Sequence, residues 1–157
     1  MKAKTIARAG ALLISLVFAT VAMGFQTNPN MGTWKLNEAK SKFAGKARNH
    51  TVVYEAAGDQ IKVVVDGVDE NGNAVHSEWT GKFDGKDYPV TGDPTGDMRS
   101  YRMVNKNTLA LTGKKGGKTM LTGRIVVSRD GKTRTVTTTA TNAQSKKVRN
   151  VAVYDKQ

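Results

Sequence analysis

The side chains that could bind a metal or move a proton are few and scattered along this sequence. The two histidines, His50 and His76, are far apart and stand beside polar residues, and the chain contains no cysteine. Zinc sites need three or four such ligands at short, regular spacings. The sequence therefore predicts no metal site and no resident cofactor, with both histidines at the surface. A haem held by His76 inside the fold is the alternative.

Two acidic loops are the other candidates for chemistry. The segment 66–73, DGVDENGN, resembles a calcium loop beginning at Asp69, but its glycine stands at position four instead of six and no glutamate stands at position twelve. The segment TGDPTGD offers Asp93 and Asp97, and nothing nearby fixes the spacing of their carboxylates. There is no glycine-rich phosphate loop and no serine nucleophile elbow. We therefore expect solvated loops, no catalytic residues, and a protein that is not an enzyme.

The elements that position these side chains are delimited by turns. Hairpin dipeptides that favour positive φ recur along the chain: Gly58-Asp59, Asn71-Gly72, Asp84-Gly85, Gly116-Gly117 and Asp130-Gly131. The first three are 13 residues apart and the last two are 14 apart. That spacing is typical of strands of roughly 8 to 10 residues joined by tight turns.

Between the turns, apolar and polar residues alternate. In QIKVVVDGV, for example, Val63 and Val65 alternate with Lys62 and Asp66. Sequential hairpins with one apolar face need a second sheet, or they must close on themselves. Because all connections are short, the sequence predicts an all-β fold, an antiparallel up-and-down barrel of 8–10 strands. A two-sheet β-sandwich is the alternative.

A short motif opens the first expected strand: Gly32-Thr33-Trp34. With the hairpin meander that follows, it resembles the lipocalin and fatty-acid-binding-protein (calycin) group of small barrels. The resemblance implies that Trp34 plugs the closed end of the barrel and that a basic side chain of the last strand, here Arg149, lies across its ring. An indole seals a barrel end with one residue, and a cation gains a favourable contact with its face.

The expected strand phase places a mixed apolar and aromatic set on the inner face. Such a lining is typical of ligand sites, so these residues are the candidate ligand-binding set: Tyr54, Val63, Val65, Trp79, Tyr101, Met103, Leu111 and Ile125. The alternative is that the same side chains simply fill the barrel. The first functional hypothesis is a binding protein that holds a small hydrophobic or amphipathic ligand without catalysis.

The first 24 residues have the pattern of a secretory signal peptide. Lys2, Lys4 and Arg8 precede the uncharged stretch ALLISLVFATVAMG, which is too short for a comfortable membrane span. We expect cleavage near residue 24, a single barrel domain over residues 25–157 with no transmembrane span, and export to a bacterial periplasm or medium. An uncleaved N-terminal anchor is the alternative.

The formal net charge of +12 supports a second functional hypothesis. A basic exterior could bind anionic polymers of the cell envelope. However, no block of five like charges occurs, and the aromatic residues are not interleaved with lysines as in nucleic-acid platforms. We therefore expect no specific nucleic-acid binding, and a monomer.

Overall fold

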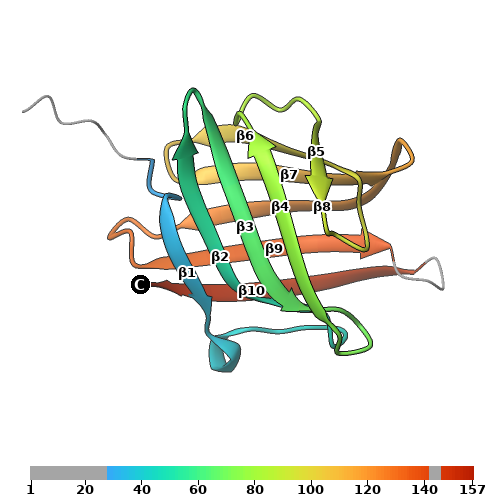
Figure 1. Ribbon diagram of the computed structural model, residues 1–157. Coiled ribbons are helices and arrows are strands. Elements are labelled where there is room, and N and C mark those ends of the chain that lie inside the picture. Colours follow the sequence, from blue (N-terminus) through green and yellow to red (C-terminus); the bar gives the residue numbers. More distant parts are fainter. Residues whose placement is uncertain (1–27, 142–145) are drawn as a thin grey trace, which may run out of the picture.

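The computed structural model describes residues 28–141 and 146–157. In this part of the chain a single antiparallel sheet closes on itself as a ten-stranded barrel (Figure 1). Closure occurs where β1 (Gly32–Leu36) pairs with β10 (Lys147–Lys156) on one side and with β2 (Arg48–Ala57) on the other. The predicted signal peptide, residues 1–24, lies outside the described residues.

The remaining elements follow in chain order. They are η1 (Glu38–Lys40), β3 (Gln60–Val68), β4 (Ala74–Gly81), β5 (Tyr88–Thr91), β6 (Met98–Asn105), β7 (Thr108–Lys115), β8 (Lys118–Val127) and β9 (Thr133–Thr141). Every strand pairs with its neighbours in sequence, so the barrel is up-and-down as predicted. The two-sheet sandwich alternative is wrong, because no strand crosses to a separate sheet.

The turn pattern in the sequence is confirmed. Each predicted hairpin dipeptide carries a glycine with positive φ: Gly58, Gly72, Gly85, Gly116, Gly117 and Gly131. The polar loop expected after β9 falls largely on residues 142–145, outside the described residues.

The barrel interior is built from the inward-facing residues of successive strands. On β3, Val63 and Val65 are buried, and their partners across the sheet, Trp79 and Ser77 of β4, are buried as well. The core continues through Leu109, Ile125 and the other buried apolar residues of β7, β8 and β10. Among the described residues, no helix is long and apolar enough to cross a membrane.

Candidate binding site in the barrel interior

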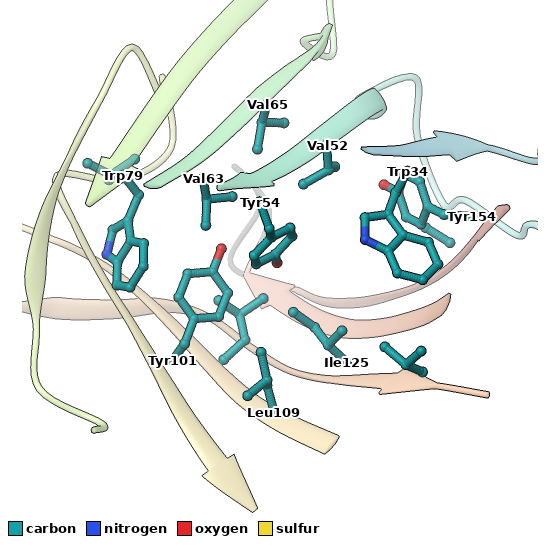
Figure 2. Close-up of a cluster of buried hydrophobic side chains, with 14 residues drawn as sticks. Trp34, Val52, Tyr54, Val63, Val65, Trp79, Tyr101, Leu109, Ile125 and Tyr154 are labelled. Carbon is teal, nitrogen blue, oxygen red and sulfur yellow. The ribbon is translucent and has the colours of Figure 1, made fainter. Parts of the chain in front are cut away.

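Trp34, on β1, lies in the barrel interior (Figure 2). Its side chain is fully buried, and its indole Nε1 donates a hydrogen bond of 2.8 Å to the carbonyl oxygen of Asn30. Register places it opposite Lys156 of β10. Gly32, with φ +103°, leaves the space that Lys156 needs, because a Cβ there would lie 3.2 Å from Cε of Lys156.

Two cations lie over the Trp34 ring, and neither is Arg149. Nζ of Lys156 is 5.1 Å from the ring centroid, and Cζ of Arg134, on β9, is 5.6 Å from it. The expectation for Arg149 is wrong because that residue pairs with Thr139 toward the other end of β10 and is exposed. A basic residue of the last strand does cover the plug, but it is Lys156.

An aromatic cluster fills the barrel beside this plug. The rings of Trp79 and Tyr101 pack edge to face with their centroids 4.8 Å apart. The rings of Tyr54 and Tyr101 pack in the same way, with a centroid distance of 6.4 Å. Nε1 of Trp79 donates a hydrogen bond of 3.0 Å to the carbonyl oxygen of Arg99. Figure 2 shows Tyr54 between Trp34 and Tyr154 on one side and Tyr101 and Trp79 on the other.

A small, partly open cavity of about 40 Å³ lies among the inward-facing side chains of the barrel. Its wall is formed by Asn49, Val52, Tyr54, Val65, Arg99, Tyr101, Leu111, Ile125, Arg134, Val136 and Tyr154. Five of the eight residues proposed from the sequence are in this wall: Tyr54, Val65, Tyr101, Leu111 and Ile125. Val63 and Trp79 are also buried, but they belong to the core around the cavity and not to its wall.

The prediction that Met103 belongs to the ligand-binding set is wrong. Its partner across the sheet is Leu109, which is buried, so Met103 has the expected phase. It is nevertheless 46% exposed, because it stands at the end of β6 beside an irregularity in the β6–β7 pairing. Met103 therefore lies outside the cavity wall.

Two arginines in the cavity wall dominate its electrostatics. Arg134 is 3% exposed, and its Nε and Nη1 have no hydrogen-bond partner. Arg99 is paired, since its Nη2 donates to Oδ2 of Asp93 at 2.5 Å, but its Nε also lacks a partner. Cζ of Arg134 lies 4.9 Å from the ring centroid of Tyr54 and 5.1 Å from that of Tyr154. These ring contacts stabilise the charge.

The neighbouring phenols are neutral at physiological pH. Burial raises the pKa of Tyr54, and it raises the pKa of Tyr154 to about 12. The hydroxyl of Tyr154 donates to the carbonyl oxygen of Asn49 at 3.1 Å. These tyrosines therefore supply hydroxyl groups to the cavity region but no negative charge.

The loop between β5 and β6 supplies the acid that pairs with Arg99. The sequence predicts a solvated loop here, but the Asp93 side chain is only 10% exposed. The chain folds back at Gly92, with φ +72°, so closely that a Cβ there would lie 2.0 Å from the carbonyl oxygen of His76. Asp93 also accepts hydrogen bonds from the backbone N–H and the hydroxyl of Thr95, which fixes its carboxylate. Asp97 remains exposed.

Sequence reasoning did not select Arg99 or Arg134 for the interior. A signal existed for Arg99, because it is two residues from Tyr101, which was placed inward. The signal for Arg134 is weaker: it shares a strand phase with Val136, but threonines occupy both faces of that strand.

The other candidates from the sequence have simple structural roles. His76 is exposed, and its Nδ1 lies 2.6 Å from Oδ1 of Asp66. Asp69 accepts the backbone N–H groups of Asn71 and Asn73 and so holds the β3–β4 turn together. Within residues 28–141 and 146–157, no group of three His, Asp or Glu side chains could hold a metal ion.

Comparison with known proteins gives no family. No family model matches the chain, and no curated protein matches it. Among solved structures, it is similar to a redesigned β-barrel, mFAP1, bound to DFHBI, with 13% identity and a TM-score of 0.47 over 82% of this chain and 95% of that chain.

Proposed function

We propose that this protein is an exported binding protein that holds one small molecule in the barrel interior without catalysing a reaction. One observation carries the proposal: a cavity whose wall includes a buried arginine, Arg134, with two unpartnered nitrogen atoms. Leaving buried N–H groups without acceptors costs free energy. A ligand that supplies those acceptors offsets this cost.

The volume of the cavity limits the ligand. Typical sites for drug-sized ligands measure about 300–1,000 Å³, whereas this cavity measures about 40 Å³. A long-chain fatty acid would therefore need the aromatic side chains to move aside. We propose a small polar or amphipathic ligand that fits between Tyr54, Tyr101 and Arg134.

The chemistry of the wall supports binding without turnover. The described wall residues include no histidine, carboxylate or thiol that could serve as a base or nucleophile. The phenols of Tyr54 and Tyr154 remain protonated because burial raises their pKa values, and arginine side chains carry a positive charge in proteins. These are groups that orient a ligand and hold it.

A second function, binding of an anionic polymer to the barrel exterior, is favoured by a separate observation. Arg124 of β8 and Arg149 of β10 are both exposed, and neither forms an ion pair among the described residues. They lie on the two strands that flank β9. Binding of an anionic envelope polymer to this face would weaken steeply with salt, whereas binding in the interior would not.

The test is to identify what the protein carries. The chain is purified from its own host at low and high salt, denatured, and the released small molecules are measured by mass spectrometry. We expect about one small molecule per chain at both salt concentrations. The amount should fall in Tyr101→Ala, which removes part of the wall, and stay unchanged in Arg149→Ala, which alters the exterior. Release of no small molecule, together with a salt-sensitive polymer in its place, would reject interior binding in favour of the exterior.

A further inference from the structure

Positive charge exceeds negative charge by one unit around the cavity. Two guanidinium groups, of Arg99 and Arg134, contribute to its wall. Among the described residues, the one acid that pairs with either of them is Asp93, and it pairs with Arg99. Arg134 is left without a carboxylate although it is almost fully buried. A buried charge without a counter-ion is costly.

The tyrosines do not supply the missing charge. Burial raises the pKa of both Tyr54 and Tyr154, so they remain protonated. For Arg99, burial opposes ionisation, but Tyr101 and Asp93 outweigh it and raise the pKa of the guanidinium. Arg99 therefore has an anionic partner in Asp93, whereas Arg134 has none among the described residues.

Size and shape narrow the class of partner. One water needs roughly 10–15 Å³, so a cavity of about 40 Å³ accommodates a group of only a few non-hydrogen atoms. Guanidinium groups bind planar oxyanions through paired N–H···O bonds. Carboxylates and nitrate combine that shape, that size and a single negative charge.

We propose that the cavity is a site for a small planar monoanion, a carboxylate or an inorganic oxyanion of the same shape, held by Arg134 together with Arg99 and the nearby phenols. This inference rests on the proposed function and names the ligand class for the same site. Water can also fill a polar cavity and accept N–H groups, but it does not neutralise the extra charge. Water-only occupancy is therefore the outcome that the test has to separate.

Formate and formamide form a matched pair for this test. They have the same number of non-hydrogen atoms and nearly the same shape, but only formate is charged. The chain has two tryptophans, so an ¹H–¹⁵N spectrum contains two indole signals. Trp34 lies against Arg134, and Trp79 lies against Tyr101 in the cavity wall. Each reagent is titrated into the intact exported protein at constant ionic strength, maintained with sodium chloride.

We expect formate to shift the Trp34 indole signal saturably, with a Kd of about 1 mM, close to the limit for so small a ligand. Formamide should shift it at least tenfold less at the same concentration. Nitrate should behave like formate if shape and charge alone decide. Butyrate and octanoate then report whether a longer organic acid also fits.

Variants locate the effect. Arg134→Met should weaken formate binding at least tenfold, and Arg134→Lys, which keeps the charge but loses the planar fork, should weaken it less. Arg124→Met makes the same replacement at an exposed position and should leave the Kd unchanged. If Arg134→Met does not fold, Arg134→Lys and Arg99→Met carry the same comparison.

The outcomes distinguish the inference from the function on which it rests. If formamide binds as tightly as formate, or if the host-purified protein releases a neutral ligand and formate does not bind, interior binding stands and the anion site is rejected. If no probe shifts either indole signal and no small molecule is released, the cavity holds water only and both proposals are rejected.

Discussion

Charged residues on the outer face of the barrel and Arg134 in its interior differ in whether they have a partner of opposite charge. On the outer face, Nζ of Lys62 lies 3.0 Å from Oε1 of Glu78, and His76 contacts Asp66 on the neighbouring strand. In the interior, Arg134 is 3% exposed and has no acidic partner among the described residues. These outer charges are paired although water already screens them, whereas Arg134 lacks an acid where screening is weakest; the neighbouring Arg99 differs from it, because Arg99 pairs with Asp93.

The difference in pairing between the outer charges and Arg134 bears on stability and function. Exposed ion pairs contribute little to stability, because solvent and salt screen them. A buried, uncompensated guanidinium opposes folding, and apolar residues at such sites are often more stabilising. Binding of the proposed anion would offset this cost, and the expected effects in the two regions run from the largest to the smallest.

The largest effect concerns the apolar side of the interior. Trp34→Ala removes a fully buried indole and leaves a cavity at the closed end, so we expect a loss of about 3–5 kcal/mol in unfolding free energy. Chemical denaturation followed by circular dichroism measures it. Val126→Ala, at a position that is 40% exposed, serves as the control for a substitution on the outer face. Similar losses in the two variants would contradict the plug assignment.

The second effect is stabilisation of the folded protein by the anion. At 100 times its Kd, a ligand that binds only the folded state adds about 2.7 kcal/mol. Formate at that concentration should stabilise the wild-type protein by this amount and should stabilise Arg134→Met, whose Kd is at least tenfold higher, by about 1.4 kcal/mol or less. Equal stabilisation of both proteins would mean that formate acts elsewhere.

A smaller effect is expected from the acid that shares the cavity region. Asp93→Asn removes the carboxylate paired with Arg99, so the site gains one positive charge. We expect formate binding to tighten by about 1 kcal/mol, roughly fivefold to tenfold, measured as the Kd from the indole titration. Asp97→Asn makes the same change at an exposed position of the same loop and should leave the Kd nearly unchanged. Weaker binding of formate to Asp93→Asn would contradict this expectation. It would show that the Asp93 carboxylate mainly holds Arg99 in position and does not compete with formate for the guanidinium.

The smallest effect lies on the outer face and depends on pH. The hydrogen bond to Asp66 raises the pKa of His76 above 6.5, its ordinary value. Protonated His76 therefore stabilises the fold fully below about pH 6.5, and this contribution is lost as the pH rises through the pKa of the folded state. An NMR titration of His76 should give a lower pKa in Asp66→Asn, with no change in formate binding. A pKa that does not move in that variant would contradict the pairing.

The strands and turns were predictable because their signals are local. An Asn-Gly or Asp-Gly pair specifies its own turn, and alternation over a few residues, as at Val63 and Val65, specifies an inner face. Arg149 was misassigned because choosing between it and Lys156 requires the register of β10 against β1, which joins opposite ends of the chain. No short segment contains that information.

The candidate site was predictable only in its apolar part. Tyr54, Tyr101 and Leu111 follow the expected alternation, whereas Met103 has the correct phase but stands too near a strand end to be enclosed. Arg134 lies between threonines on a strand that is polar on both faces, so periodicity does not indicate its direction. The pairing of Asp93 with Arg99 depends on how a loop folds back at Gly92, which neighbouring residues alone do not determine.

The most direct test of the anion site is a pair of high-resolution crystal structures, one from crystals equilibrated in formate and one from crystals equilibrated in formamide. The account predicts planar three-atom density beside the guanidinium of Arg134 in formate, and ordered water at the same place in formamide. Identical water density in both crystals, with no formate in the barrel, would contradict it.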